Sequence, residues 1–107
     1  KKYTKISGKI KIPKASASSV AVRQVEYDED DSEVDIEFKK DVSWENPKVT
    51  IKADGKDYAK KITDKDDDDI EVKVEKLEKG KTYTCTISGV SRKGEKNYTT
   101  ITFTFTA

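Results

Sequence analysis

A run of carboxylates at residues 64–69 has the residue types that could bind a metal most directly. It reads Asp64-Lys-Asp-Asp-Asp-Asp69 and offers carboxylates at the alternate positions Asp64, Asp66 and Asp68. Calcium takes about six to eight oxygen ligands, and such a loop can supply several of them. The glycine and distal glutamate of an EF-hand loop are lacking, however. The alternative is a solvated connection that protects a sheet edge from aggregation, and we expect no metal and no other cofactor.

An aromatic residue and a basic group form a second candidate site. Trp44 lies in the loop before the third expected strand, and Arg92, Lys93 and Lys96 lie in a later loop. Aromatic rings at the poles of β-sandwiches can stack on sugars or peptide side chains. If alternate loops share a pole, these residues lie beside the acidic run. Trp44 could equally close the bottom of the core.

The composition argues against catalysis. The chain of 107 residues contains no histidine, the commonest general base and the commonest transition-metal ligand. A single cysteine, Cys85, excludes an internal disulfide and a multi-cysteine zinc site, and we interpret it as a buried apolar side chain. No pattern places a carboxylate pair in an apolar pocket that would separate the two pKa values. We therefore predict no catalytic residue and no enzymatic activity.

Charge and hydropathy limit the partners. The 22 basic and 21 acidic residues leave a net charge of +1, which argues against a nucleic-acid partner. No apolar run approaches the length of a membrane span, so membrane insertion is not expected. The chain starts at Lys1-Lys2 without methionine, which indicates a fragment of a longer protein.

Alternating apolar and polar residues predict the strands that would position these loops. The expected strands are seven segments, at roughly 20–27, 33–39, 48–53, 57–63, 69–77, 82–90 and 98–106. In the first strand, Val20 and Val22 fall at even positions and Val25 and Tyr27 at odd positions. A bulge near Arg23-Gln24 would let both pairs face the core. Residues 28–32 form a polar turn, and Asp54-Gly55 indicates a tight hairpin.

One corner motif is more specific than the strand pattern. Leu77-x-x-Gly80-x-x-Tyr83 is similar to a tyrosine corner, in which the tyrosine hydroxyl reaches back to the upstream backbone. From about residue 20 to residue 107 the chain resembles a fibronectin type III or bacterial immunoglobulin-like module. The resemblance implies an all-β, seven-stranded antiparallel Greek-key sandwich, with Leu77, Gly80 and Tyr83 as its structural corner.

The first nineteen residues differ from the rest. Residues 1–19 read as a strand followed by a linker, and 20–107 as the sandwich domain. The opening segment is either the last strand of a preceding copy in a tandem array or an edge strand or tail of this domain.

The resemblance also implies a role. We predict a noncatalytic, monomeric structural or spacer module of a bacterial cell-surface or secreted protein, in contact with neighbouring domains of the same chain. The alternative is an adhesive module that binds a surface glycan or a protein at the pole around Trp44, Asp64–Asp69 and Arg92–Lys96. An adhesive module would lose binding on Trp44→Ala while staying folded, and a spacer would lose only stability.

Overall fold

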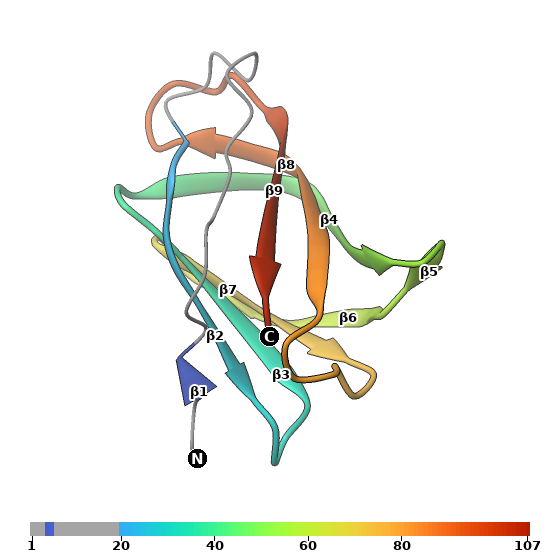
Figure 1. The fold of residues 1–107 in the computed structure, drawn as a ribbon. Coiled ribbons are helices and arrows are strands. Elements are labelled where there is room, and N and C mark those ends of the chain that lie inside the picture. Colours follow the sequence, from blue (N-terminus) through green and yellow to red (C-terminus); the bar gives the residue numbers. More distant parts are fainter. Residues whose placement is uncertain (1–3, 6–19) are drawn as a thin grey trace.

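Two antiparallel β-sheets face each other in a sandwich-like arrangement (Figure 1). The computed structural model describes residues 4–5 and 20–107. One sheet has the strand order β1-β2-β3-β7-β6 and the other β5-β4-β8-β9. The strands are β1 Thr4–Lys5, β2 Val22–Asp28, β3 Glu33–Phe38, β4 Val42–Ala53, β5 Lys56–Asp57, β6 Ala59–Lys65, β7 Asp69–Val74, β8 Thr82–Arg92 and β9 Thr99–Thr106. The prediction of an all-β protein with two packed antiparallel sheets is confirmed.

The N-terminal segment is described only in part. Thr4–Lys5 form β1, which pairs in antiparallel fashion with Tyr27 and Glu26 of β2. The rest of the expected N-terminal strand and linker lies outside the described residues. In the part of the chain that the structure covers, no helix has the length and hydropathy needed to cross a membrane.

Alternation along the strands builds the core between the two sheets. Side chains at every second position point inward because successive residues of a strand face opposite sides of the sheet. Cys85 is fully buried in this core. The largest fully buried side chains are Tyr83, Phe103, Phe105, Ile36, Ile51, Ile70, Ile87 and Ile101. Charged residues at the intervening positions of β2, β3 and β7 therefore face outward.

The position of Trp44 differs from the sequence-based expectation. Trp44 lies within β4, which begins at Val42, and not in a loop before a strand that starts at residue 48. The register of β4 against β8 shifts between Trp44 and Lys48, and Asn46 adopts φ 46° in the shift. Pro47 has no amide hydrogen to donate to the sheet, so it is tolerated at such a bulge. The bulge interrupts the alternation, which is why the first half of β4 resembled a loop.

A second bulge sets the outer face of β2. The register of β2 against β3 shifts between Val22 and Gln24, so the bulge expected near Arg23-Gln24 is confirmed. Beyond it, Val25 and Tyr27 point into the core. Gln24, Glu26 and Asp28 consequently fall on the outer face of the sheet.

Candidate metal centre

The expected binding pole is partly assembled by side-chain contacts of Trp44 and Lys93. Trp44 Nε1 donates a hydrogen bond to the carbonyl oxygen of Asp66 at 3.0 Å, and the indole ring packs edge-on against Phe38 with 5.6 Å between centroids. Lys93 Nζ contacts Asp67 Oδ2 at 3.2 Å. Trp44 is thus only partly exposed and packs against the core, as its interpretation as a core plug expects.

The other predicted residues of that pole form fewer contacts with one another. Arg92 ends β8 beside Val42, and Lys96 is exposed in the following loop with φ 57°. Among the described residues, the carboxylates of Asp64, Asp66 and Asp68 do not converge into a group with metal-ligand spacing. Residues 64–68 of the acidic run are exposed, and the carbonyl oxygens of Asp67 and Asp68 accept hydrogen bonds from the amides of Val42 and Phe38.

Two tyrosine hydroxyls hold the corner between β7 and β8. Tyr83 Oη accepts a hydrogen bond from the amide of Glu78 at 2.8 Å, and Gly80 has φ 86°, a region that favours glycine. Tyr27 Oη accepts from the amide of Leu77 at 3.0 Å. Tyr27 lies on β2, fifty residues before Leu77 in the sequence, so the sequence motif alone did not show its part in this corner.

Removing one of these hydroxyls should weaken the fold. We expect Tyr83→Phe to lower the free energy of unfolding by about 1–2 kcal/mol, because the part-buried amide of Glu78 loses its acceptor. Urea denaturation measures the difference. Tyr98→Phe is the matched control, since Tyr98 is exposed. An unchanged unfolding midpoint for Tyr83→Phe would contradict a stabilising role of the corner hydroxyl.

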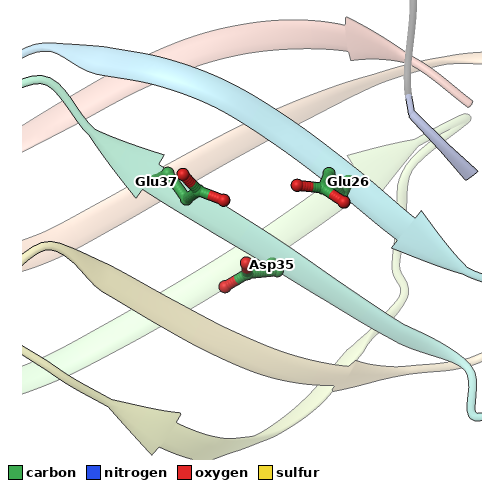
Figure 2. A group of neighbouring side chains, drawn as sticks. All are labelled: Glu26, Asp35 and Glu37. Atoms are coloured by element: carbon green, nitrogen blue, oxygen red, sulfur yellow. The ribbon is translucent and has the colours of Figure 1, made fainter. Parts of the chain in front are cut away.

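Carboxylates gather on the outer face of the β2 and β3 strands. Figure 2 shows Glu26 on β2 beside Asp35 and Glu37 on β3, and carboxylate oxygens of the three lie within 4.8 Å of one another. The register places Glu26 directly opposite Asp35, and Asp35 directly opposite Glu71 of β7. Like charges in directly opposed positions destabilise a sheet. This group, which we call the strand cluster (Glu26, Asp35 and Glu37), must therefore be neutralised.

Nitrogen donors bind the carboxylates of two members of the strand cluster, Glu26 and Glu37. Gln24 Nε2 donates to Glu26 Oε1 at 2.7 Å and to Glu37 Oε2 at 3.0 Å, and so bridges the two carboxylates. The guanidinium of Arg23 also pairs with Glu37. The oxygens that a cation would need at these two residues are thus already bound by protein groups.

A bound proton neutralises the carboxylate of the third member, Asp35. Burial raises the pKa of Asp35 to about 8, and the hydrogen bond to Asp69 together with the Asp69 charge adds to the shift. Burial also raises the pKa of Asp69. Two carboxyl groups that share a hydrogen bond retain one proton between them. At neutral pH Asp35 is therefore mainly a carboxylic acid, which is a poor cation ligand.

A second group of carboxylates lies at the hairpin between β2 and β3. Asp28, Asp31 and Glu33 each offer one oxygen within 4.8 Å of the other two; we call them the hairpin cluster. Asp28 and Glu33 face each other across the ladder because they are the last register pair of β2 and β3. Asp28 and Glu33 are buried and Asp31 is exposed, so solvent reaches the cluster from one side.

Asp28 is the most unusual member of the hairpin cluster. Its side chain is fully buried, and its Oδ1 accepts hydrogen bonds from the amides of Asp30 at 3.0 Å and Asp31 at 3.2 Å. Its Oδ2 is also buried and has no hydrogen-bond partner in the described part of the chain. Turn formation therefore uses one oxygen of Asp28 and leaves the other unbound toward the cluster.

The surroundings of the hairpin cluster fix its geometry. Glu33 Oε2 accepts a hydrogen bond from Thr63 Oγ1 at 3.2 Å. Lys73 Nζ donates to the carbonyl oxygen of Asp31 at 2.8 Å, which brings one positive charge to the edge of the turn. Ser32 adopts φ 53°, so the turn is tight. The carboxylate of Glu33 and the backbone of the turn are thus already positioned by protein contacts.

The sequence pattern alone did not indicate the hairpin cluster as a metal candidate. It indicated a polar turn at residues 28–32 and candidate ligands at alternate positions of the run 64–69. A usable signal existed in the alternation, because the bulge in β2 puts Asp28 on the outer face and a tight turn then pairs it with Glu33. The burial of Asp28 had no sequence signal.

Comparison with known families decides the class of the domain. Residues 16–106 match the family model described as the CopC domain. The chain belongs to this family. CopC proteins bind copper and confer copper resistance, share an immunoglobulin-like β-sandwich fold and are periplasmic or secreted. Neither a curated protein nor a solved structure matches the chain significantly.

Membership in the CopC family corrects the predicted role. The prediction of a structural or spacer module is wrong, and so is the alternative of an adhesive module at the pole around Trp44, because the family is one of copper-binding proteins. The error arose because the corner motif and the strand pattern report on an architecture that hosts unrelated functions. The predicted location agrees with the family in outline, and CopC proteins are not known as enzymes.

The donor atoms of this CopC domain do not suit copper. Copper(II) sites favour imidazole nitrogen, and copper(I) sites favour thiolate or thioether sulfur. The 107 residues contain neither histidine nor methionine. Burial raises the pKa of the Cys85 thiol, and Cys85 is fully enclosed in the core, so it does not offer a thiolate. Carboxylates and carbonyls remain as side-chain and backbone donors, and these suit hard cations.

Proposed function

We propose that this CopC domain binds an oxygen-preferring divalent cation, Ca²⁺, at the hairpin cluster of Asp28, Asp31 and Glu33. The observation that carries the proposal is the buried Oδ2 of Asp28, which has no hydrogen-bond partner in the described part of the chain. Leaving a buried polar oxygen unbound costs about 1–3 kcal/mol, and more for a charged group. A bound cation would remove that cost.

The hairpin cluster is a better cation site than the strand cluster. Gln24 and Arg23 bind the carboxylates of the strand cluster, and a proton occupies its Asp35–Asp69 pair. In the hairpin cluster the nearby ammonium of Lys73 is directed at the carbonyl of Asp31. An uncompensated carboxylate oxygen therefore remains at Asp28.

The number and kind of donors favour calcium over smaller cations. Calcium accepts irregular oxygen sets at about 2.3–2.6 Å and keeps water in the remaining positions. Three carboxylates whose oxygens lie within 4.8 Å of one another fit around one such ion, and the exposed Asp31 leaves a side open to water. A site with few protein ligands should bind with a Kd of roughly 10⁻⁴–10⁻³ M, the range of extracellular calcium modules.

The proposal also covers the strand topology of the domain and its cellular location. We infer a seven-stranded immunoglobulin-like Greek key with β1 and β5 as short additions, and the strand orders β2-β3-β7-β6 and β4-β8-β9 support this inference. We infer a noncatalytic, monomeric domain that acts outside the cytoplasm, where calcium is abundant enough for a weak site.

Isothermal titration calorimetry of CaCl₂ into the domain tests the proposed site. Asp28→Asn keeps an oxygen to cap the turn but removes the carboxylate charge, so we expect calcium affinity to fall at least about tenfold. Asp30→Asn is the matched control, because Asp30 lies in the same turn and is not a member of the hairpin cluster. Equal affinity of Asp28→Asn and the unsubstituted domain would overturn the site. Tighter binding of Cu²⁺ than of Ca²⁺ would overturn the choice of cation.

A further inference from the structure

A groove opens between β4 of one sheet and β6 of the other. It has a volume of about 330 Å³. Its apolar lining comprises Val49, Ala59, Ile62 and Val72. Val49, Ala59 and Ile62 are only partly buried against the core. The hydrophobic core is therefore incompletely covered along this side of the sandwich.

Three lysines line the groove around its apolar residues. Lys48 comes from β4, and Lys60 and Lys61 come from β6. Their ammonium groups form no ion pair or hydrogen bond within the described residues, and all three side chains are exposed. The one carboxylate of the lining, Asp57, is already engaged, because its Oδ1 accepts from the amides of Ile51 and Ala59 at 3.0 Å. Because three lysines face one carboxylate, the lining of the groove has a net positive charge.

The backbone edges beside the groove are also available. β6 is the last strand of its sheet and pairs only with β7. β4 pairs with β5 only at Lys52 and Ala53, so its stretch 48–50 has no strand on the groove side in the described structure. An extended peptide can add to such an edge through main-chain hydrogen bonds, while pockets for alternate side chains give selectivity.

We propose that this groove binds an extended segment of a partner protein with alternating acidic and apolar side chains. The apolar side chains would cover Val49 and Ile62, and the acidic side chains would pair with Lys48, Lys60 and Lys61. The period of two matches the alternation along a strand. The charge of the three lysines selects an acidic partner over a basic one.

Amide chemical shifts of the isotope-labelled domain test this proposal, with a capped hexapeptide of alternating glutamate and valine as the probe. The titration is run with EDTA present, so the outcome does not depend on the proposed cation site. We expect saturable shifts confined to residues 48–50 and 59–62. A peptide of alternating lysine and valine should produce none.

Charge reversal separates recognition from simple protection of the edge, because lysines on edge strands also prevent aggregation. The double substitution Lys60→Glu with Lys61→Glu should weaken binding of the acidic peptide at least about tenfold. Lys39→Glu with Lys40→Glu is the matched control, since these adjacent lysines are exposed and lie outside the groove. The proposal is overturned by an absence of shifts at millimolar peptide, by equal shifts with the lysine peptide, or by undiminished binding after charge reversal at Lys60 and Lys61.

Discussion

Replacing Gly89 by alanine should lower the free energy of unfolding by about 3 kcal/mol or more, a large part of the stability of a domain of this size. Gly89 adopts φ 74°, and a Cβ built on it would overlap the carbonyl oxygen of Glu45 and lie 3.1 Å from the Cα of Pro47. The left-handed conformation alone costs alanine about 1–2 kcal/mol. The backbone overlap adds to this because neither strand of the bulge can move without losing ladder hydrogen bonds.

Gly94→Ala provides the control for this effect. Gly94 has φ 90°, but a Cβ there meets nothing within 4 Å, so only the conformational cost applies. We therefore expect a loss of about 1–2 kcal/mol for Gly94→Ala. Thermal denaturation followed by circular dichroism measures both. Equal destabilisation by the two substitutions would contradict the close approach of Gly89 to the β4 bulge.

The second large effect concerns Asp35 and should depend on pH. In the folded protein the pKa of Asp35 is raised to about 8 from its ordinary value of 3.8, chiefly by burial. The fold therefore favours the neutral acid. The contribution of Asp35 to stability is complete below pH 3.8 and is lost as the pH rises through about 8.

Asp35→Asn removes this pH-dependent loss. At pH 9 we expect the variant to be more stable than the unsubstituted domain by about 1–3 kcal/mol, and near pH 4 we expect a small difference. This expected stability difference is smaller than the free energy that corresponds to the full pKa difference, because Asp35 is only half-buried and water screens its charge. Urea denaturation across this pH range, with EDTA present, tests the prediction. Glu29→Gln removes an exposed carboxylate from the turn as a control, and a pH-independent difference for Asp35→Asn would contradict the shared proton.

Much of the architecture was predictable because alternation with a period of two is a strong signal. Strand β3 was expected at 33–39 and spans Glu33–Phe38, and the bulge in β2 followed from a change of parity. The start of β4 was not predictable, because the bulge at Trp44 to Lys48 breaks the alternation that identifies a strand. Long-range partners such as the Tyr27 hydroxyl at the corner leave no local pattern.

The candidate site was much less predictable than the fold. Residues 64–69 contain many carboxylates close together in the sequence. Such a run does not determine whether the carboxylate oxygens lie near one another in the fold or whether they are buried. Residues 64–68 are exposed and water solvates their charges, whereas the side chain of Asp28 is fully buried at the base of the hairpin beside Glu33. A sequence shows the residue types of such a site but not the absence of a partner for one oxygen.

A calcium titration of the isotope-labelled domain, followed by backbone amide shifts, tests the central claim most directly. The cation site at Asp28, Asp31 and Glu33 predicts saturable shifts that centre on residues 28–33 at sub-millimolar to millimolar calcium. Those shifts should be lost in Asp28→Asn and retained in Asp30→Asn. No shift at millimolar calcium, or shifts confined to residues 64–69, would contradict the account.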